Sequence, residues 1–293
     1  MLYFRPLNSA MSDEITPKKL IDVEEVIRGK NPALLKWMPS LIINYLKRIA
    51  HQDHINDLLR RHGDKRSFDF VDEAIKEFGV EVTCEGLENL PKEGGCIIAS
   101  NHPIGGLDGM ALIQVVAKVR KDQIFIVNDI LLHLKNLDNI FVGVNKHGKN
   151  STEILDQIDR YYAGEGSLLI FPAGLVSRKQ NNGLIRDLTW KKSFITKAKK
   201  YKRNIIPVHI AGRNSNFFYN LARWRGKLGI KANIEMLYLM DEMYHQLGKN
   251  IHIKIGKPLS YELFNEQYND HDWAQKVKEH IYTLAEGTDD FRP

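Results

Sequence analysis

The stretch GCIIASNHPIGGLDGMALI, residues 95–113, places an apolar strand, a glycine turn and the start of a helix in direct succession. Glycines such as Gly105 and Gly106 permit the sharp fold-back that this succession needs. Strand–turn–helix units of this kind build α/β domains. The turn also carries one imidazole, His102, and one carboxylate, Asp108. We therefore ask whether these two side chains form an acid/base pair or only complete a tight loop.

The same alternation continues along residues 80–293. Short β-type runs occur as VEVTCEG, GCIIAS, QIFIVN, IFVGVN, SLLIFP, NIIPVHI and IHIKIG. Helix candidates begin near Leu107, Ser151, Leu188, Asn214 and Lys231, and one follows Ser260. Such alternation predicts an α/β domain with a largely parallel central sheet flanked by helices. In such sheets the chemistry lies beyond the carboxyl ends of the strands.

Residues 1–79 differ from this pattern and predict an N-terminal helical segment. In NPALLKWMPSLIINYLKRIA the apolar residues recur at helical spacing, with Pro39 as an expected break. SFDFVDEAIKEFG is typical of a short helix that ends at a glycine. We expect two parts, the helical segment 1–79 and an α/β domain at 80–293.

The composition indicates a globular chain and sets limits on its partners. Of its 293 residues 43% are hydrophobic and 27% charged, which excludes wholesale disorder. The net charge of +6 suits nucleic acid, an anionic membrane surface or an acidic substrate alike. The two cysteines lie in no metal-ligating or CxxC spacing, which favours a reducing cytosol. The opening residues predict no signal peptide.

His102 and Asp108 have the chemistry of a general-base pair. A histidine can accept a proton from a hydroxyl at neutral pH, and a carboxylate can hold its tautomer and stabilise the imidazolium. In the alternative interpretation Asp108 only favours the helix N-terminus and His102 only ends a strand. Taken alone, the turn favours this alternative.

A second motif, LLIFPAGLVSR, spans residues 168–178. We expect a buried strand that leaves Ser177 and Arg178 at the mouth of a site, where an arginine binds phosphate or carboxylate. The alternative is a strand-end turn with a solvated arginine.

A third motif follows, in which Lys191 and Lys192 begin a basic helix. Pro207 then interrupts NIIPVHI, which predicts an edge strand, a bulge or a position lining the site.

The order of these motifs resembles the lysophospholipid/glycerolipid acyltransferase superfamily, which includes 1-acylglycerol-3-phosphate acyltransferases. The likeness covers about residues 80–260. The family's N-H-x4-D motif is matched by Asn101, His102 and Asp108. Its phosphate-binding block is matched by NIFVGVNKHG, its FPEGTRS block by residues 171–177, and its VPV strand by residues 206–208.

The departures from the family pattern concern the acceptor. Five residues instead of four separate His102 from Asp108. Ala173 replaces the glutamate and Val176 the arginine of FPEGTRS, and Asn145 or Lys146 replaces an arginine in the phosphate block. HPxGGLDG combined with FPAGxxSR resembles the bacterial hemolysin-like branch of ornithine- and glycine-lipid O-acyltransferases.

The resemblance implies that His102 deprotonates an acceptor hydroxyl, which attacks an acyl thioester of acyl carrier protein or coenzyme A, with Asp108 orienting His102. It implies a lyso-lipid acceptor, no bound cofactor and no metal. Backbone amides at Gly105–Gly106 or after Pro172 are candidates for an oxyanion hole. The candidate binding residues are Asn101, Gly105, Gly106, Asn145, Lys146, Phe171, Pro172, Gly174, Ser177, Arg178, Lys191 and Lys192.

Lipidic substrates imply access to a membrane surface, and no apolar run is long enough to span one. We expect a peripheral protein on the cytoplasmic face of the inner membrane. The segment with Trp37, Leu41, Ile42 and Tyr45, bordered by Lys36, Lys47 and Arg48, suits an interfacial helix as well as a helix packed on the domain. Phe217, Phe218 and Trp224 mark a second candidate surface.

Three other functions compete with this interpretation. An enzyme acting on lysophosphatidate is the nearest, and the altered FPEGTRS residues count against it. A catalytically inactive lipid-binding protein is another, and the presence of both His102 and Asp108 counts against that. Nucleic-acid binding ranks last, because the basic residues cluster on one helix without an aromatic platform.

Overall fold

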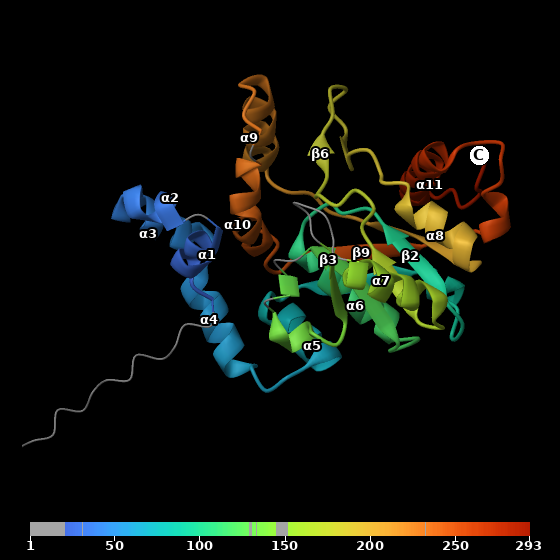
Figure 1. The fold of residues 1–293 in the computed structure, drawn as a ribbon, viewed down its shortest axis with the longest axis horizontal. Coiled ribbons are helices and arrows are strands. Elements are labelled where there is room, and N and C mark those ends of the chain that lie inside the picture. Colours follow the sequence, from blue (N-terminus) through green and yellow to red (C-terminus); the bar gives the residue numbers. More distant parts are fainter. Residues whose placement is uncertain (1–20, 31, 129–130, 133, 145–151, 232) are drawn as a thin grey trace, which may run out of the picture.

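The computed structural model describes residues 21–293 except 31, 129–130, 133, 145–151 and 232 (Figure 1). Its described part contains a seven-stranded sheet with the order β1-β9-β8-β2-β5-β3-β4. The strands are β1 (Glu81–Glu85), β2 (Cys96–Ser100), β3 (Gln123–Asn128), β4 (Phe141–Val144), β5 (Ser167–Ile170), β8 (Asn204–Ile210) and β9 (Asn250–Ile255). Neighbours pair in parallel except β8 and β9, which are antiparallel. The predicted α/β class with a largely parallel sheet is confirmed.

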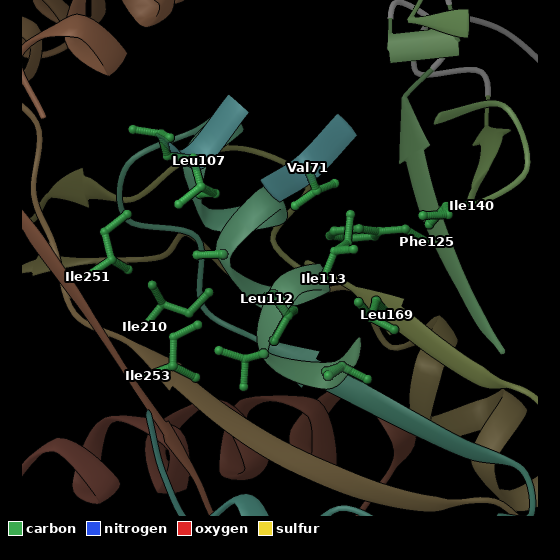
Figure 2. Packing of buried hydrophobic residues seen from close by; sticks show 14 of the residues in the cluster. Val71, Leu107, Leu112, Ile113, Phe125, Ile140, Leu169, Ile210, Ile251 and Ile253 are labelled. Carbon is green, nitrogen blue, oxygen red and sulfur yellow. The ribbon is translucent and has the colours of Figure 1, made fainter. Parts of the chain in front are cut away.

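Helices cover both faces of the sheet. One face carries α4 (Gln52–Arg61), α5 (Ser67–Glu77) and α6 (Gly106–Ala117), and the other α7 (Thr152–Ala163), α8 (Ser193–Tyr201) and α11 (Asp270–Ala285). The alternation within β2 explains the layers, because Ile98 joins the first core and Ile97 the second. Figure 2 shows the first core, in which Leu112 of α6 lies against the sheet.

The N-terminal segment forms an arm of short helices beside the domain (Figure 1, blue). These helices are α1 (Val23–Lys30), α2 (Pro32–Trp37) and α3 (Ser40–Ile49), and α4 and α5 lead from them to the sheet. The predicted break at Pro39 is confirmed, since this residue directly precedes α3. Val71 of α5 is fully buried in the first core, so α5 packs as part of the α/β body.

A second group of elements stands above the sheet in Figure 1. It comprises the hairpin β6 (Arg178–Lys179) and β7 (Ile185–Arg186), with α9 (Asn216–Lys227), a 3₁₀ helix η4 (Ile234–Tyr238) and α10 (Leu239–Tyr244). The other 3₁₀ turns are η1 (Leu87–Asn89), η3 (Lys135–Leu137) and η5 (Tyr261–Leu263). The helix expected near Leu188 begins only at Ser193, because the preceding residues form buried contacts described below.

Pro207 does not lie in an edge strand, which corrects one of the three expectations for it. β8 lies between β9 and β2, and Pro207 is paired with Ala99. On the side of β9, regular pairing covers only Val208–Ile210, and the Pro207 carbonyl accepts a hydrogen bond from the Gly256 N–H at 2.8 Å. The missing N–H of the proline therefore falls where β9 leaves the ladder, so no regular hydrogen bond is lost.

His209 makes the stability of the fold depend on pH. Burial, with smaller contributions from the positive charges of His252 and Lys254, lowers the pKa of His209 from 6.5 to about 4. Below pH 6.5 the unfolded chain binds a proton that the folded chain excludes. The free energy of unfolding should therefore fall by up to about 1.4 kcal/mol per pH unit between pH 6.5 and 4.

Urea unfolding of the wild type and of His209→Gln at pH 7 and pH 5 tests this expectation. The substitution should flatten the loss of stability between the two pH values, whereas His271→Gln at an exposed position should not. Equal slopes in the wild type and His209→Gln would contradict it.

Candidate active site

His102 and Asp108 meet at the carboxyl end of β2. The imidazole Nδ1 lies 2.9 Å from Oδ2 of Asp108, which is the third residue of α6 and fully buried. Because a carboxylate only accepts hydrogen bonds, Nδ1 carries the proton and Nε2 keeps its lone pair. The His102 side chain remains 18% exposed. The pair thus leaves one basic nitrogen that a substrate can approach.

The additional residue in the turn does not separate the pair. Gly105 has a φ of +138°, which only glycine adopts without strain, and the chain folds back there. The N–H groups of Ile104 and Gly105 donate to Oδ2 of Asp108 at 2.8 and 2.9 Å. The turn therefore closes around the carboxylate. The Gly105 amide was a candidate for the oxyanion hole, and this candidate is wrong because the amide already donates to Asp108. Gly106 is the first residue of α6.

Phe171 brings the second motif to the first. It follows β5, the neighbour of β2, and its ring stacks on the His102 imidazole with centroids 4.1 Å apart and planes at 11°. The Gly174 N–H then donates to the Phe171 carbonyl at 2.9 Å, and Gly174 has a φ of +67°. This turn returns the chain beside the site, with Pro172 buried within it. The ring limits the orientations open to the imidazole.

Ser177 does not lie at the mouth of the site, which corrects its predicted position. Its side chain is buried, and its hydroxyl donates to Oδ1 of Asp187 at 2.6 Å. Its backbone N–H donates to the His102 carbonyl at 2.7 Å, and the His102 N–H donates to Asp187 Oδ1 at 3.2 Å. Ser177 therefore supports the His102 backbone. Asp187 is the first residue of DLTWKKSFITKAKKYKRNIIPVHI, the stretch of the third motif, but sequence reasoning gave it no role.

Arg178 is also buried, which corrects its expected exposure. Its guanidinium lies 2.8 Å from Glu235 Oε1 and 5.0 Å from the centroid of the Phe218 ring. Burial lowers the pKa of Arg178, and the charge of fully buried Glu235 opposes that change. Arg225 pairs with the same carboxylate at 2.9 Å. These three charges join β6 to α9 and η4. The Arg178 side chain is therefore held inside the fold by Glu235 and does not lie at the mouth of the site.

The remaining candidate residues separate into three groups. The side-chain amide of Asn101 exchanges two hydrogen bonds with the Ile210 backbone, at 2.9 and 2.7 Å, and so joins the ends of β2 and β8. Lys191 and Lys192 are exposed, and Lys191 Nζ lies over Gly174, 3.5 Å from where a Cβ would sit. Asn145 and Lys146 lie outside the described residues.

The assembled site can perform base chemistry with its own side chains. His102 offers an accessible nitrogen, Asp108 supplies the compensating charge, and Phe171 covers one face of the ring. Across the described ranges no cluster of three His, Cys, Asp or Glu side chains is arranged to hold a metal ion. A hydroxyl that reaches Nε2 would lose its proton to a group whose charge Asp108 offsets.

The fold, the His–Asp pair and the motifs beside it define an acyltransferase, and the chain belongs to this family, whose model matches residues 25–290. It is 42% identical over 266 residues to a lyso-glycine lipid O-acyltransferase of Bacteroides thetaiotaomicron, covering 90% of this chain and 97% of the relative. It is 40% identical over 266 residues to a protein of the same name from Phocaeicola vulgatus, covering 90% and 95%. The predicted superfamily and its aminolipid branch are confirmed.

Among solved structures, the 1-acyl-sn-glycerophosphate (LPA) acyltransferase PlsC from Thermotoga maritima is similar, with a TM-score of 0.44 and 16% sequence identity. The match covers 85% of this chain and 98% of that chain.

Proposed function

We propose that the protein transfers a fatty acyl group from an acyl thioester to the hydroxyl of a lyso-glycine lipid, N-(3-hydroxyacyl)glycine. The His102–Asp108 pair, whose Nε2 has no hydrogen-bond partner in the described part of the chain, carries the proposal for the reaction. The acceptor rests on relatives that share 40–42% identity over nearly their whole length. Acyl carrier protein and coenzyme A both present the required thioester.

In the proposed reaction His102 Nε2 takes the proton of the acceptor hydroxyl as its oxygen attacks the thioester carbonyl carbon. The new C–O bond replaces the C–S bond, and the leaving thiolate takes the proton back from the imidazolium. Asp108, buried and bound to Nδ1, stabilises the imidazolium while it exists. The ester forms without an acyl-enzyme intermediate.

The environment of the site suits a carboxylate headgroup. The positions at which the family motif has glutamate and arginine hold Ala173 and Val176, both buried and apolar. The exposed ammonium group of Lys191 lies beside this turn instead, and Lys192, also exposed, is the next residue in the chain. We assign the glycine carboxylate of the acceptor to these lysines, since an ammonium attracts a carboxylate without requiring fixed geometry.

An acceptor panel tests the proposal. N-(3-hydroxyacyl)glycine, N-(3-hydroxyacyl)ornithine and lysophosphatidate are each offered with acyl carrier protein and coenzyme A thioesters of one chain length. The glycine compound should give the highest kcat/KM, at least about tenfold above lysophosphatidate, which corresponds to about 1.4 kcal/mol in transition-state binding. N-acylglycine without the 3-hydroxyl is the matched control and should give no product. Preference for lysophosphatidate would overturn the proposed acceptor.

We also propose that the enzyme works as a peripheral protein on the cytoplasmic face of the inner membrane. Trp37 and Leu41 on the arm are 87% and 79% exposed, far more than a helix packed on the domain would leave open. Lys36 and Arg48 are exposed beside them, which suits anionic headgroups. None of the described helices is long and apolar enough to cross a membrane.

The second candidate surface adjoins the first. Tyr238 of η4 bonds to the Tyr45 hydroxyl of α3 at 2.7 Å and packs edge-on against Phe217 of α9, with ring centroids 4.9 Å apart. Phe217 and Trp224 are 54% and 68% exposed, whereas Phe218 is fully buried and belongs to the core. The arm and α9 therefore offer one apolar surface to the membrane.

A further inference from the structure

We propose that Asp187 is a positioning residue for His102, holding the backbone of the catalytic turn so that the imidazole keeps its place. The inference rests on the proposed role of His102 as general base. Asp187 touches no substrate in this scheme and acts only through His102.

The Asp187 carboxylate joins the segments of His102 and Ser177 to its own. It is buried, and its Oδ1 accepts the Ser177 hydroxyl at 2.6 Å and the His102 N–H at 3.2 Å. Its Oδ2 accepts the Trp190 indole N–H at 2.9 Å. Burial raises the pKa of Asp187, while the hydrogen bonds from Ser177 and Trp190 oppose that rise. Because all three partners donate, the arrangement requires a group that only accepts.

Both backbone groups of His102 are held by this assembly. Asp187 accepts its N–H, and the Ser177 N–H donates to its carbonyl at 2.7 Å. Asp108 and Phe171 contact the ring instead, at Nδ1 and on one face. Ring and backbone are thus fixed by different residues. Proton transfer needs such placement, because a shift of about 1 Å costs on the order of 10²-fold in rate.

The assembly is itself anchored in the second core. The Asp187 N–H donates to the Tyr282 hydroxyl of α11 at 2.7 Å, and Trp190 is fully buried among the residues of that core. These contacts explain why the segment before Ser193 is not helical. They also connect the catalytic turn to α11 through Asp187, which bonds to His102 on one side and to Tyr282 on the other.

Asp187→Asn keeps the size of the side chain and replaces one acceptor with a donor. The new amide N–H₂ must face Trp190 or the Ser177–His102 side, so at least one hydrogen bond is lost. We expect kcat to fall roughly 10–100-fold, as for a misplaced base, with KM for both substrates within about twofold of the wild type. Asp159→Asn is the matched control, since Asp159 also accepts three hydrogen bonds, but from the side chains of Lys197, Lys200 and Tyr201, which lie outside the turn. It should lower Tm without lowering kcat.

The deciding measurement is Asp187→Asn in the His102→Ala background. With no imidazole to position, the second substitution should change the residual rate by less than about twofold. An equal loss in both backgrounds, or full activity of Asp187→Asn, would overturn the inference. Full activity of His102→Ala would instead overturn the proposed base. If Asp187→Asn does not fold, Ser177→Ala replaces it, since this variant keeps the hydrogen bond from the Ser177 N–H to the His102 carbonyl. It should lower kcat roughly 3–10-fold with KM nearly unchanged. No loss of kcat would overturn the inference.

Discussion

Replacement of His102 by alanine is expected to lower kcat for acyl transfer by roughly 10²–10⁴-fold, the usual contribution of a general base. Among the described residues nothing hydrogen-bonds to Nε2 of the imidazole, since Asp108 is bound to Nδ1 at 2.9 Å. Because the imidazole stacks on Phe171 and bonds to the fully buried Asp108, its loss should also lower Tm, while the protein stays folded at the assay temperature. Initial rates with N-(3-hydroxyacyl)glycine, together with a thermal melt, measure both quantities.

Asp108→Asn extends this test to the partner. An amide can present its N–H₂ to Nδ1 or to the amides of Ile104 and Gly105, and either choice disturbs the tautomer or the turn. We expect a loss of kcat of similar size to that of His102→Ala. His271→Ala, a substitution at an exposed histidine on α11, is the control and should keep full activity. Activity of either site variant within about threefold of the wild type would contradict a His–Asp base.

The second large effect concerns the membrane surface. Trp37→Ala combined with Leu41→Ala should lower the partition onto anionic phospholipid vesicles by roughly 100-fold or more, because each buried apolar side chain contributes about 1.5–3 kcal/mol. Both side chains are exposed, so the double variant should fold normally and acylate a water-soluble, short-chain acceptor at the wild-type rate. Sedimentation with vesicles measures the partition.

A second pair of substitutions controls for the loss of exposed apolar side chains. Leu155 of α7 and Leu263 of η5 are 50% and 41% exposed, and both elements pack on α8, on the face of the sheet that holds the second core. Their replacement by alanine should leave vesicle binding unchanged. Binding that is unchanged in Trp37→Ala/Leu41→Ala, or reduced equally by both pairs, would rule out the arm as the docking surface.

Several features of the site followed from the sequence because they are local. The turn that joins His102 to Asp108 spans a few residues, and the glycine at position 105 supplies the backbone conformation that closes it. The strands followed from their apolar runs, and the parallel sheet from their alternation with helices. The meeting of Phe171 and His102 also follows from the carboxyl ends of parallel strands sharing one edge of the sheet.

Other features depended on contacts between distant parts of the chain. The sequence around an arginine that follows a strand is the same whether its side chain is solvated or buried. Arg178 is buried because Glu235 of η4 lies beside it in the folded chain. Trp37 and Leu41 follow helical spacing that is equally suitable for a core face. Their exposure depends on which elements pack against the arm.

The sequence by itself thus determined the α/β class, the family and the closeness of His102 to Asp108, because these rest on periodicity and on residues close together in the chain. Only the tertiary structure decided that Ser177 and Asp187 support the His102 backbone and that Pro207 lies inside the sheet. The physical reason is that a hydrogen bond between residues 75 or 85 positions apart leaves no periodic trace. Such a bond exists only once strand order has placed the two loops at the same edge.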